Sequence, residues 1–184
     1  MSLIIDHLYL SPVVVSRDTS FFKAKKITHV LVAAKSLKQH FPETVTYHQL
    51  QLSDNPTANI SKYFTEGIRF LHEAISKEQN VLVHCMGGIS RSTSMVIAYV
   101  MFTMNLSFEK AFEFVKKQHS KTNPNPGFVS QLKKLEAAIA EYNTLKTEKY
   151  EKEIDYKLLD ALIFDHANRE KSNKKETKIK TKTK

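Results

Sequence analysis

The residues able to do chemistry gather in one short stretch, 81–92. Its apolar, β-branched beginning predicts a buried strand, which ends at Cys85, the only cysteine of the chain. A loop containing Gly87 and Gly88 follows, and at Ser92 an apolar stretch begins whose spacing predicts a buried helix. Such a junction gathers backbone N–H groups and the positive end of a helix dipole, which is how proteins bind a phosphate dianion. Because the same field favours thiolate over thiol, we expect Cys85 to be a nucleophile.

Two further side chains of this stretch suit phosphoryl transfer. Arg91 returns to the cysteine if the loop curls, and its planar guanidinium can bind two phosphate oxygens at once. The hydroxyl of Ser92 can hydrogen-bond to the sulfur when the sulfur must leave. The alternative is that Cys85 is a small buried hydrophobic residue, as most free cysteines are. The strand, the glycines and the arginine around Cys85 favour the nucleophile.

The stretch 84–92, which reads His-Cys-x-x-Gly-x-Ser-Arg-Ser, resembles the signature loop of the cysteine-dependent dual-specificity protein phosphatases. This resemblance implies a cysteinyl-phosphate intermediate, with Cys85 as the nucleophile and Arg91 as the phosphate clamp. It also implies that His84 orients the backbone of Cys85. The loop residues implied to bind the phosphate are Met86, Gly87, Gly88, Ile89, Ser90 and Arg91.

A carboxylic acid is expected near the cysteine, because the oxygen that leaves phosphorus needs a proton. Residues 52–60 form a loop by composition, since Asp, Asn, Pro and Ser cluster there between a strand and a helix. Asp54 in this loop occupies the place of the family's general acid, so the resemblance implies that it protonates the leaving group and then activates water. The alternative is that Asp54 only stabilises the Asp-Asn-Pro turn. The signature loop favours the catalytic role.

Composition excludes several other classes of protein. The histidines and the single cysteine show none of the spacings of a metal site, so we expect neither a metal nor a cofactor. One cysteine cannot form an internal disulfide, which indicates a cytoplasmic setting, with the nucleus as a second location. No apolar stretch is long enough for a transmembrane segment. The net charge of +9 lies mainly in residues 171–184, which carry seven lysines and one glutamate, so the folded part is not strongly basic.

The apolar patterns predict an α/β fold with a central mixed sheet of about four to five strands flanked by helices. The resemblance adds that the sheet is mostly parallel, as in the protein tyrosine phosphatases. Strands are expected at residues 4–10, 27–34, 45–52 and 81–83. Helices are expected after the N-capping residues Asp18, Asn59, Ser107 and Asn125.

The chain divides into three parts. Residues 1–142 are expected to form the catalytic domain, with no kinase-docking module before it, because the resemblance begins near residue 3. Residues 143–170 carry an apolar stripe and predict a helical extension, which either packs on the domain or forms a docking or dimer surface. Residues 171–184 are too polar to bury anything and predict a disordered tail. Contact of this tail with nucleic acid or an anionic membrane is a less favoured alternative to solvation.

We therefore expect a protein phosphatase of the atypical dual-specificity kind. Its substrate would be a phosphoprotein carrying phosphotyrosine, phosphoserine or phosphothreonine, and a kinase is one candidate. Two alternatives stay open, a phosphate-binding module without turnover and a phosphatase for lipid or RNA. The presence of Cys85, Arg91 and Asp54 disfavours the first, because binding needs no nucleophile. The second is disfavoured because residues 86–90 offer no charge for additional phosphates.

Overall fold

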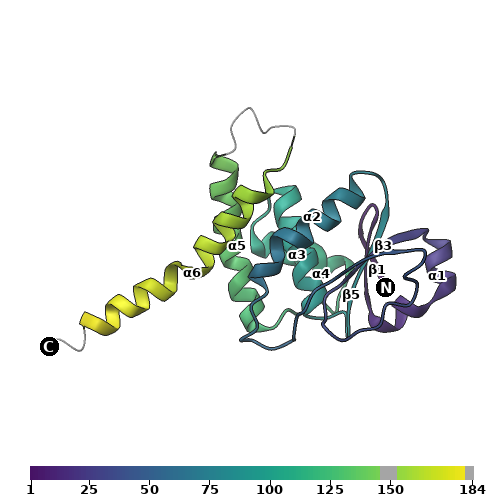
Figure 1. The fold of residues 1–184 in the computed structure, drawn as a ribbon, viewed down its shortest axis with the longest axis horizontal. Helices are drawn as coiled ribbons and strands as arrows, with labels where there is room; N and C mark the ends of the chain where they lie inside the picture. The colour runs from purple at the N-terminus through teal and green to yellow at the C-terminus, as the bar shows by residue number, and fades with distance from the viewer. Residues whose placement is uncertain (146–152, 181–184) are drawn as a thin grey trace.

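The computed structural model describes residues 1–145 and 153–180, which contain a five-stranded sheet (Figure 1). Across the sheet the strands stand in the order β1-β2-β5-β3-β4. β1 is antiparallel to β2, and the other neighbouring strands are parallel. The strands are β1 Ser2–Ile5, β2 Leu8–Pro12, β3 Ile27–Val32, β4 Thr46–Gln49 and β5 Asn80–Cys85. The predicted mixed, mostly parallel sheet is confirmed.

The single strand predicted over residues 4–10 is wrong, because the chain forms a hairpin there. β1 and β2 pair up to Ile5 and Leu8, which leaves Asp6 and His7 as a two-residue turn. The backbone of His7 has a φ of 66°, the left-handed conformation that such turns require. Two short apolar runs on either side of this turn therefore look like one run in the sequence.

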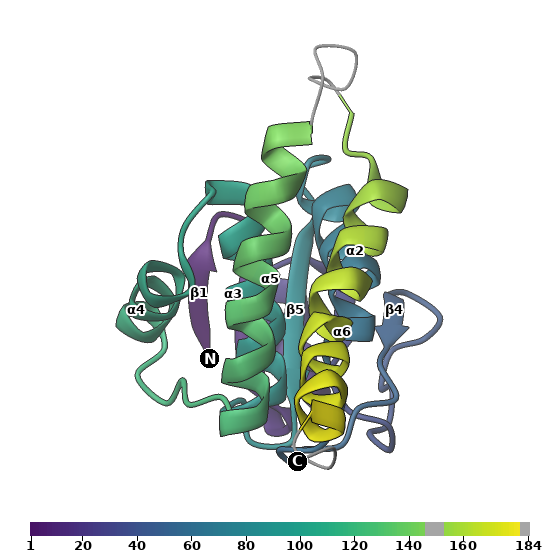
Figure 2. The same ribbon diagram turned by 90° about the vertical axis from the view of Figure 1, so that its left-hand side faces the viewer.

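Helices cover both faces of the sheet, but unequally (Figures 1 and 2). The short helix α1, Thr19–Ala24, packs on one face, where Phe21 and Phe22 join a small apolar cluster. The other helices lie on the opposite face and enclose the main core. They are α2 Phe64–Ile75, α3 Arg91–Met104, α4 Phe108–Gln118, α5 Pro126–Leu145 and α6 Tyr156–Lys180. Two short 3-10 helices, η1 Val13–Arg17 and η2 Ser61–Tyr63, connect the elements.

The side-chain alternation of β5 determines where the cysteine lies. Val81, Val83 and Cys85 face the main core, whereas Leu82 belongs to the cluster beneath α1. Because β5 is flanked by β2 and β3, Cys85 lies at the carboxyl end of the middle strand. In open parallel sheets, ligands bind beyond the carboxyl ends of the strands. The alternation therefore brings the sulfur to the face on which α3 begins.

Three of the four predicted helix caps are confirmed. The side chains of Asp18, Ser107 and Asn125 each accept a hydrogen bond from the backbone N–H three residues later, at 3.0, 3.3 and 3.0 Å. These are interactions between close neighbours in the sequence, which is why the residue types alone predict them.

The fourth cap, Asn59, is wrong. Its side chain accepts a hydrogen bond from the Ser61 hydroxyl at 2.6 Å, and the chain passes through η2 before α2 begins. The N–H groups of Ile60 and Ser61 donate instead to Oε1 of Gln131 on α5, at 2.9 and 3.0 Å. The Gln131 side chain, from the distant helix α5, thus accepts the hydrogen bonds that the sequence assigns to Asn59 as a local cap.

The start of α5 also holds the loop that precedes η2. Gln131 donates to the carbonyl of Ala58 at 2.9 Å. A Cβ atom on Gly127 would collide with the carbonyl oxygen of Pro56, so only glycine allows this close approach. Residues 53–59 are therefore attached to α5 through both a side chain and the backbone.

The helical extension packs on the domain. This is the first of the two alternatives that the sequence leaves open for residues 143–170. Leu159, Leu162 and Ile163 of α6 are buried in the main core, and α6 lies alongside α5 (Figure 2). The backbone N–H of Asp155, just before the helix, donates to the Tyr142 hydroxyl at 2.9 Å. Phe164 on the same helix is 72% exposed.

α6 continues to Lys180, so residues 171–180 are helical where the sequence predicts a disordered tail. Lysine and glutamate have high helix propensity, and neither glycine nor proline interrupts this stretch. The rest of the predicted tail, 181–184, and residues 146–152 of the extension lie outside the described residues. Among the helices described, none has the length and apolar composition needed to cross a membrane.

Replacing Leu159 by alanine tests whether α6 belongs to the cooperative unit. Leu159 is fully buried, so Leu159→Ala should lower the free energy of unfolding by about 2–4 kcal/mol through the cavity it leaves. Phe164→Ala on the same helix is the matched control. It should change the free energy of unfolding by less than about 1 kcal/mol, because Phe164 is exposed. Urea unfolding measures both values. Equally small losses would show that α6 does not contribute to the folded core.

Candidate active site

The signature loop, residues 84–92, contains the turn between β5 and α3, and the backbone carbonyls of residues 84, 86, 88, 89 and 90 are bound by groups from outside this turn. The hydrogen bonds are Ala33 N to His84 O (2.8 Å), Val13 N to Met86 O (3.1 Å), His119 Nε2 to Gly88 O (2.8 Å), Asn123 N to Ile89 O (2.9 Å) and Ser94 Oγ to Ser90 O (2.7 Å). In a trans peptide the N–H points away from the carbonyl of the same peptide plane. Outward carbonyls therefore leave the N–H groups of the loop facing inward, which makes a site for an anion.

Gly88 is the residue at which the loop comes closest to the sheet. Its backbone has a φ of 65°. A Cβ atom there would lie 2.7 Å from the backbone nitrogen of Pro12 and 2.7 Å from the carbonyl carbon of Ser11. Both the positive φ and the backbone contact exclude a larger residue, so the glycine of the motif has a steric cause.

The sulfur of Cys85 is buried and has one polar neighbour beside it. The hydroxyl of Ser92, in the first turn of α3, donates to Sγ at 3.1 Å. Cys85 is 1% exposed and Ser92 is fully buried. The hydroxyl and the start of α3 both direct partial positive charge toward the sulfur.

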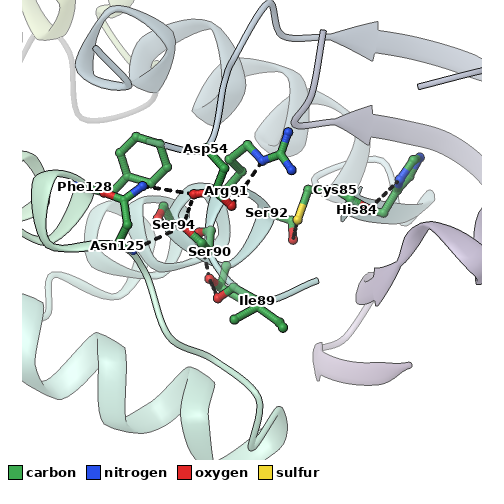
Figure 3. Close-up of polar contacts among 11 residues, drawn as sticks. Asp54, His84, Cys85, Ile89, Ser90, Arg91, Ser92, Ser94, Asn125 and Phe128 are labelled. Carbon is green, nitrogen blue, oxygen red and sulfur yellow. Dashed lines mark hydrogen bonds and ion pairs between the residues drawn. The ribbon is translucent and has the colours of Figure 1, made fainter. Parts of the chain in front are cut away.

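Asp54 reaches the signature loop from residues 53–59, as Figure 3 shows. Its Oδ1 accepts from the Ser90 hydroxyl at 2.7 Å and from the side-chain amide of Asn125 at 3.0 Å. The Ser90 hydroxyl itself accepts from the backbone N–H of Asn125 at 3.1 Å. The carboxylate is thus fixed between the loop and the start of α5.

Arg91 faces the other oxygen of this carboxylate. Its Nε lies 3.4 Å from Oδ2 of Asp54, which is an ion pair, and this buried nitrogen forms no hydrogen bond with any described residue. In Figure 3 the guanidinium is drawn between Asp54 and the pair formed by Cys85 and Ser92. Arg91 therefore carries a buried donor that a phosphate oxygen can satisfy.

His84 lies on the opposite side of the strand from the sulfur. Its ring is fully buried and points away from Sγ in Figure 3, and its Nδ1 lies 3.4 Å from the carbonyl oxygen of Cys85. Nε2 is buried without a hydrogen-bond partner among the described residues. Burial lowers the pKa of His84 to about 4, so the ring is neutral at physiological pH. The predicted contact with the Cys85 backbone is present, although it is long.

The remaining residues predicted to bind phosphate all lie in the signature loop. Met86 and Ile89 are 56% and 41% exposed, so their side chains form part of the protein surface while their backbone belongs to the loop. One residue of the site was predicted only as a helix cap. Asn125 holds both Ser90 and Asp54, and its residue type as a helix cap was the sequence signal for it.

The lowered pKa of His84 makes stability depend on pH in a definite direction. Between pH 6.5 and 4 the unfolded chain takes up a proton at this residue that the folded protein does not, so stability falls as pH falls. The contribution should reach about 3 kcal/mol at pH 4. Replacing His84 by glutamine removes the titrating group, so unfolding curves of His84→Gln should show a shallower loss over this range. Identical slopes for the two proteins would contradict a buried neutral ring.

Comparisons with known proteins agree with this geometry. The family described as "Dual specificity phosphatase, catalytic domain" matches residues 8–138. Dual specificity protein phosphatase 1B of Arabidopsis thaliana is 36% identical over 132 residues, which are 72% of this chain and 79% of that protein.

Two solved structures have the same fold. The crystal structure of DUSP15 aligns with a TM-score of 0.73 and 32% identity, covering 80% of this chain and 97% of the other. The crystal structure of human tyrosine phosphatase-like serine/threonine/tyrosine-interacting protein aligns with a TM-score of 0.71 and 33% identity, covering 74% and 95%.

A sulfur at the end of the middle strand, beneath converging amides and beside an arginine, fits the class of cysteine-dependent phosphatases. Within that superfamily the chain belongs to the dual specificity phosphatases, because their catalytic-domain family matches most of its length. The match ends at residue 138, so α6 lies beyond it.

Proposed function

We propose that the protein hydrolyses phosphotyrosine and phosphoserine or phosphothreonine monoesters on proteins through a cysteinyl-phosphate intermediate. The observation that carries this proposal is the position of the Cys85 sulfur, which is buried beside the Ser92 hydroxyl at the base of a loop whose amides face inward. Binding of a phosphate dianion needs these amides, but it does not need a sulfur. The sulfur is required only if a bond to phosphorus forms.

In the first step the Cys85 thiolate attacks phosphorus, the S–P bond forms and the P–O bond to the substrate breaks. Asp54 gives its proton to the departing oxygen, which leaves as an alcohol or phenol. The loop amides and the Arg91 guanidinium stabilise the charge on the transferred phosphoryl oxygens. Arg91 is paired with the Asp54 carboxylate in the absence of phosphate. Binding of the dianion draws the guanidinium away, and the freed carboxylate takes up a proton from solvent before it protonates the leaving oxygen.

In the second step a water molecule attacks the phosphorus of the cysteinyl-phosphate. The carboxylate of Asp54 takes a proton from the water, the P–S bond breaks and inorganic phosphate forms. The electron pair of the broken bond returns to sulfur, where the Ser92 hydroxyl donates its hydrogen bond. These two steps use only side chains of this chain, and Asp54 ends in its protonated form.

The side chains at the mouth of the loop support a protein substrate. Met86 and Ile89 are exposed and uncharged, and no lysine stands among residues 86–90 to bind a second phosphate of a lipid headgroup. A phosphorylated protein, for example a kinase, carries a single phosphate on the reacting side chain. It therefore needs no lysine in the loop to bind a second phosphate. We extend the proposal to a signalling role in the cytoplasm or nucleus, which the single cysteine supports through its need for a reducing compartment.

A phosphate-binding protein without turnover is the second candidate. One observation favours it, the likeness to human tyrosine phosphatase-like serine/threonine/tyrosine-interacting protein. In the present chain, however, Ser92 contacts the sulfur and Asn125 holds Asp54 against the loop, and neither contact contributes to phosphate binding alone.

Turnover of para-nitrophenyl phosphate separates these two candidates. The wild-type protein should hydrolyse it, and Cys85→Ser should lose activity by a factor on the order of 10⁴ or more while still binding phosphate. Phosphopeptides, inositol phospholipids and triphosphate RNA, compared at equal concentration, then identify the substrate class. Absence of turnover by wild type, with phosphate binding intact, would establish the binding protein instead. Faster turnover of the lipid or RNA would overturn the protein substrate.

The role of Asp54 is tested by the acidity of the leaving group. Asp54→Asn should slow phosphotyrosine peptides by roughly 10²–10⁴, and should slow aryl phosphates progressively less as their leaving groups become more acidic. Rates across a series of aryl phosphates measure this dependence. Glu43→Gln is the matched control, because Glu43 is an exposed carboxylate outside the network, and it should leave the series unchanged. A steeper dependence in Glu43→Gln than in Asp54→Asn would reassign the acid.

A further inference from the structure

One buried histidine outside the signature loop is bonded directly to it. His119 follows the last turn of α4 and is 6% exposed. Its Nε2 lies 2.8 Å from the carbonyl oxygen of Gly88, and its Nδ1 lies 3.0 Å from the hydroxyl oxygen of Ser2 in β1. α4 packs beside β1, which brings these two partners to opposite edges of one ring (Figure 2).

The two partners determine which nitrogen carries the proton. A carbonyl oxygen can only accept, so Nε2 is the protonated nitrogen and donates to Gly88. The other nitrogen, Nδ1, then accepts from the Ser2 hydroxyl, which fixes this tautomer. Burial lowers the pKa of His119, in agreement with a neutral ring. Both ring nitrogens are therefore satisfied by a single arrangement of hydrogens.

His119 differs from the other groups that bind the loop carbonyls. Val13, Ala33 and Asn123 use their backbone N–H groups, and Thr93 and Ser94 belong to α3, the helix that the loop itself begins. Within the described part of the chain, His119 is the one side chain from outside β5 and α3 that donates a hydrogen bond to a carbonyl of the loop. It can therefore be changed without altering the backbone of the loop or its helix.

We propose that His119 is a positioning residue for the phosphate-binding loop and that Ser2 of the N-terminal strand holds His119 in the required tautomer. By binding the Gly88 carbonyl on the outside, His119 turns the N–H of Ile89, in the same peptide plane, toward the phosphate. Gly88 has a φ of 65° and no side chain to hold it in place. Because glycine lacks a Cβ atom, its backbone has a wider range of conformations than that of other residues, so this peptide needs an external contact to fix it. The inference rests on the proposed function, because it concerns the affinity of the same loop for phosphate.

The test is the dissociation constant of inorganic phosphate, measured on the full chain by titration of its amide NMR signals. His119→Ala should weaken phosphate binding roughly tenfold, because one amide no longer faces the dianion. His119→Gln should restore binding to within about threefold of wild type, because the glutamine amide can donate to the Gly88 carbonyl from a similar position. His166→Ala is the matched control, since His166 is a partly buried histidine bonded to Glu141 on α5, and it should leave phosphate binding unchanged.

Two further measurements on these proteins report quantities that a purely structural role of His119 would not change. In wild type, long-range ¹H–¹⁵N spectra should show Nε2 protonated and Nδ1 unprotonated in the ring whose signals disappear in His119→Gln. For aryl phosphate, KM should rise more than kcat falls in His119→Ala. If His119→Ala does not fold, His119→Gln and the ring spectrum of wild type still decide the matter.

Two results would overturn the inference. One is a lower unfolding temperature of His119→Ala with an unchanged dissociation constant, and the other is a ring protonated at Nδ1 in wild type. Failure of the proposed function looks different, because wild type would then bind phosphate with His119-dependent affinity but hydrolyse no aryl phosphate.

Discussion

The function of this protein depends on hydrogen bonds that hold the backbone carbonyls of residues 84, 86, 88, 89 and 90 from outside the loop. Each such bond fixes a peptide plane, and together they gather N–H groups around the point where a phosphoryl group must sit. Donors that are fixed before the substrate arrives do not have to reorient during the reaction, which is the main source of electrostatic stabilisation in enzymes. The partners come from η1, the residue after β3, α3 and the segment between α4 and α5, so much of the domain takes part in shaping one loop.

The fold supplies these partners through ordinary sheet geometry. β5 stands in the middle of the sheet and is bonded on both sides, and the alternation of its side chains sends Cys85 toward α3 and His84 toward the opposite face. The burial that makes the strand rigid also keeps His84 neutral and places the sulfur at the edge of the core. A single residue of register shift would exchange these two side chains, so the packing of Val81 and Val83 specifies the chemistry as well as the core.

The sequence predicts those features that arise between near neighbours. The caps at Asp18, Ser107 and Asn125 and the strand–loop–helix around Cys85 all follow from residue types within a few positions. The hairpin at His7 was missed because the turn lacks glycine and asparagine, the residues that usually mark it.

Contacts between distant segments could not be predicted in the same way. Gln131 replaces Asn59 as the cap of the segment before α2, although 71 residues separate Ile60 from its partner. The bond from Asn125 to Asp54 spans the same separation, and that from His119 to Gly88 spans 31 residues. Each depends on where α4 and α5 pack, which is a property of the assembled core rather than of local residue types.

The attachment of residues 53–59 to α5 has a consequence for timescales. In many enzymes a flexible lid carries the acid into place, and its closure takes microseconds to milliseconds. Here Gly127 and Gln131 already anchor that segment, so phosphate capture requires mainly the rotation of one side chain, Arg91. Rotation of one side chain requires no rearrangement of the backbone. We therefore expect turnover to be limited by bond breaking or by departure of phosphate, and not by a slow backbone movement.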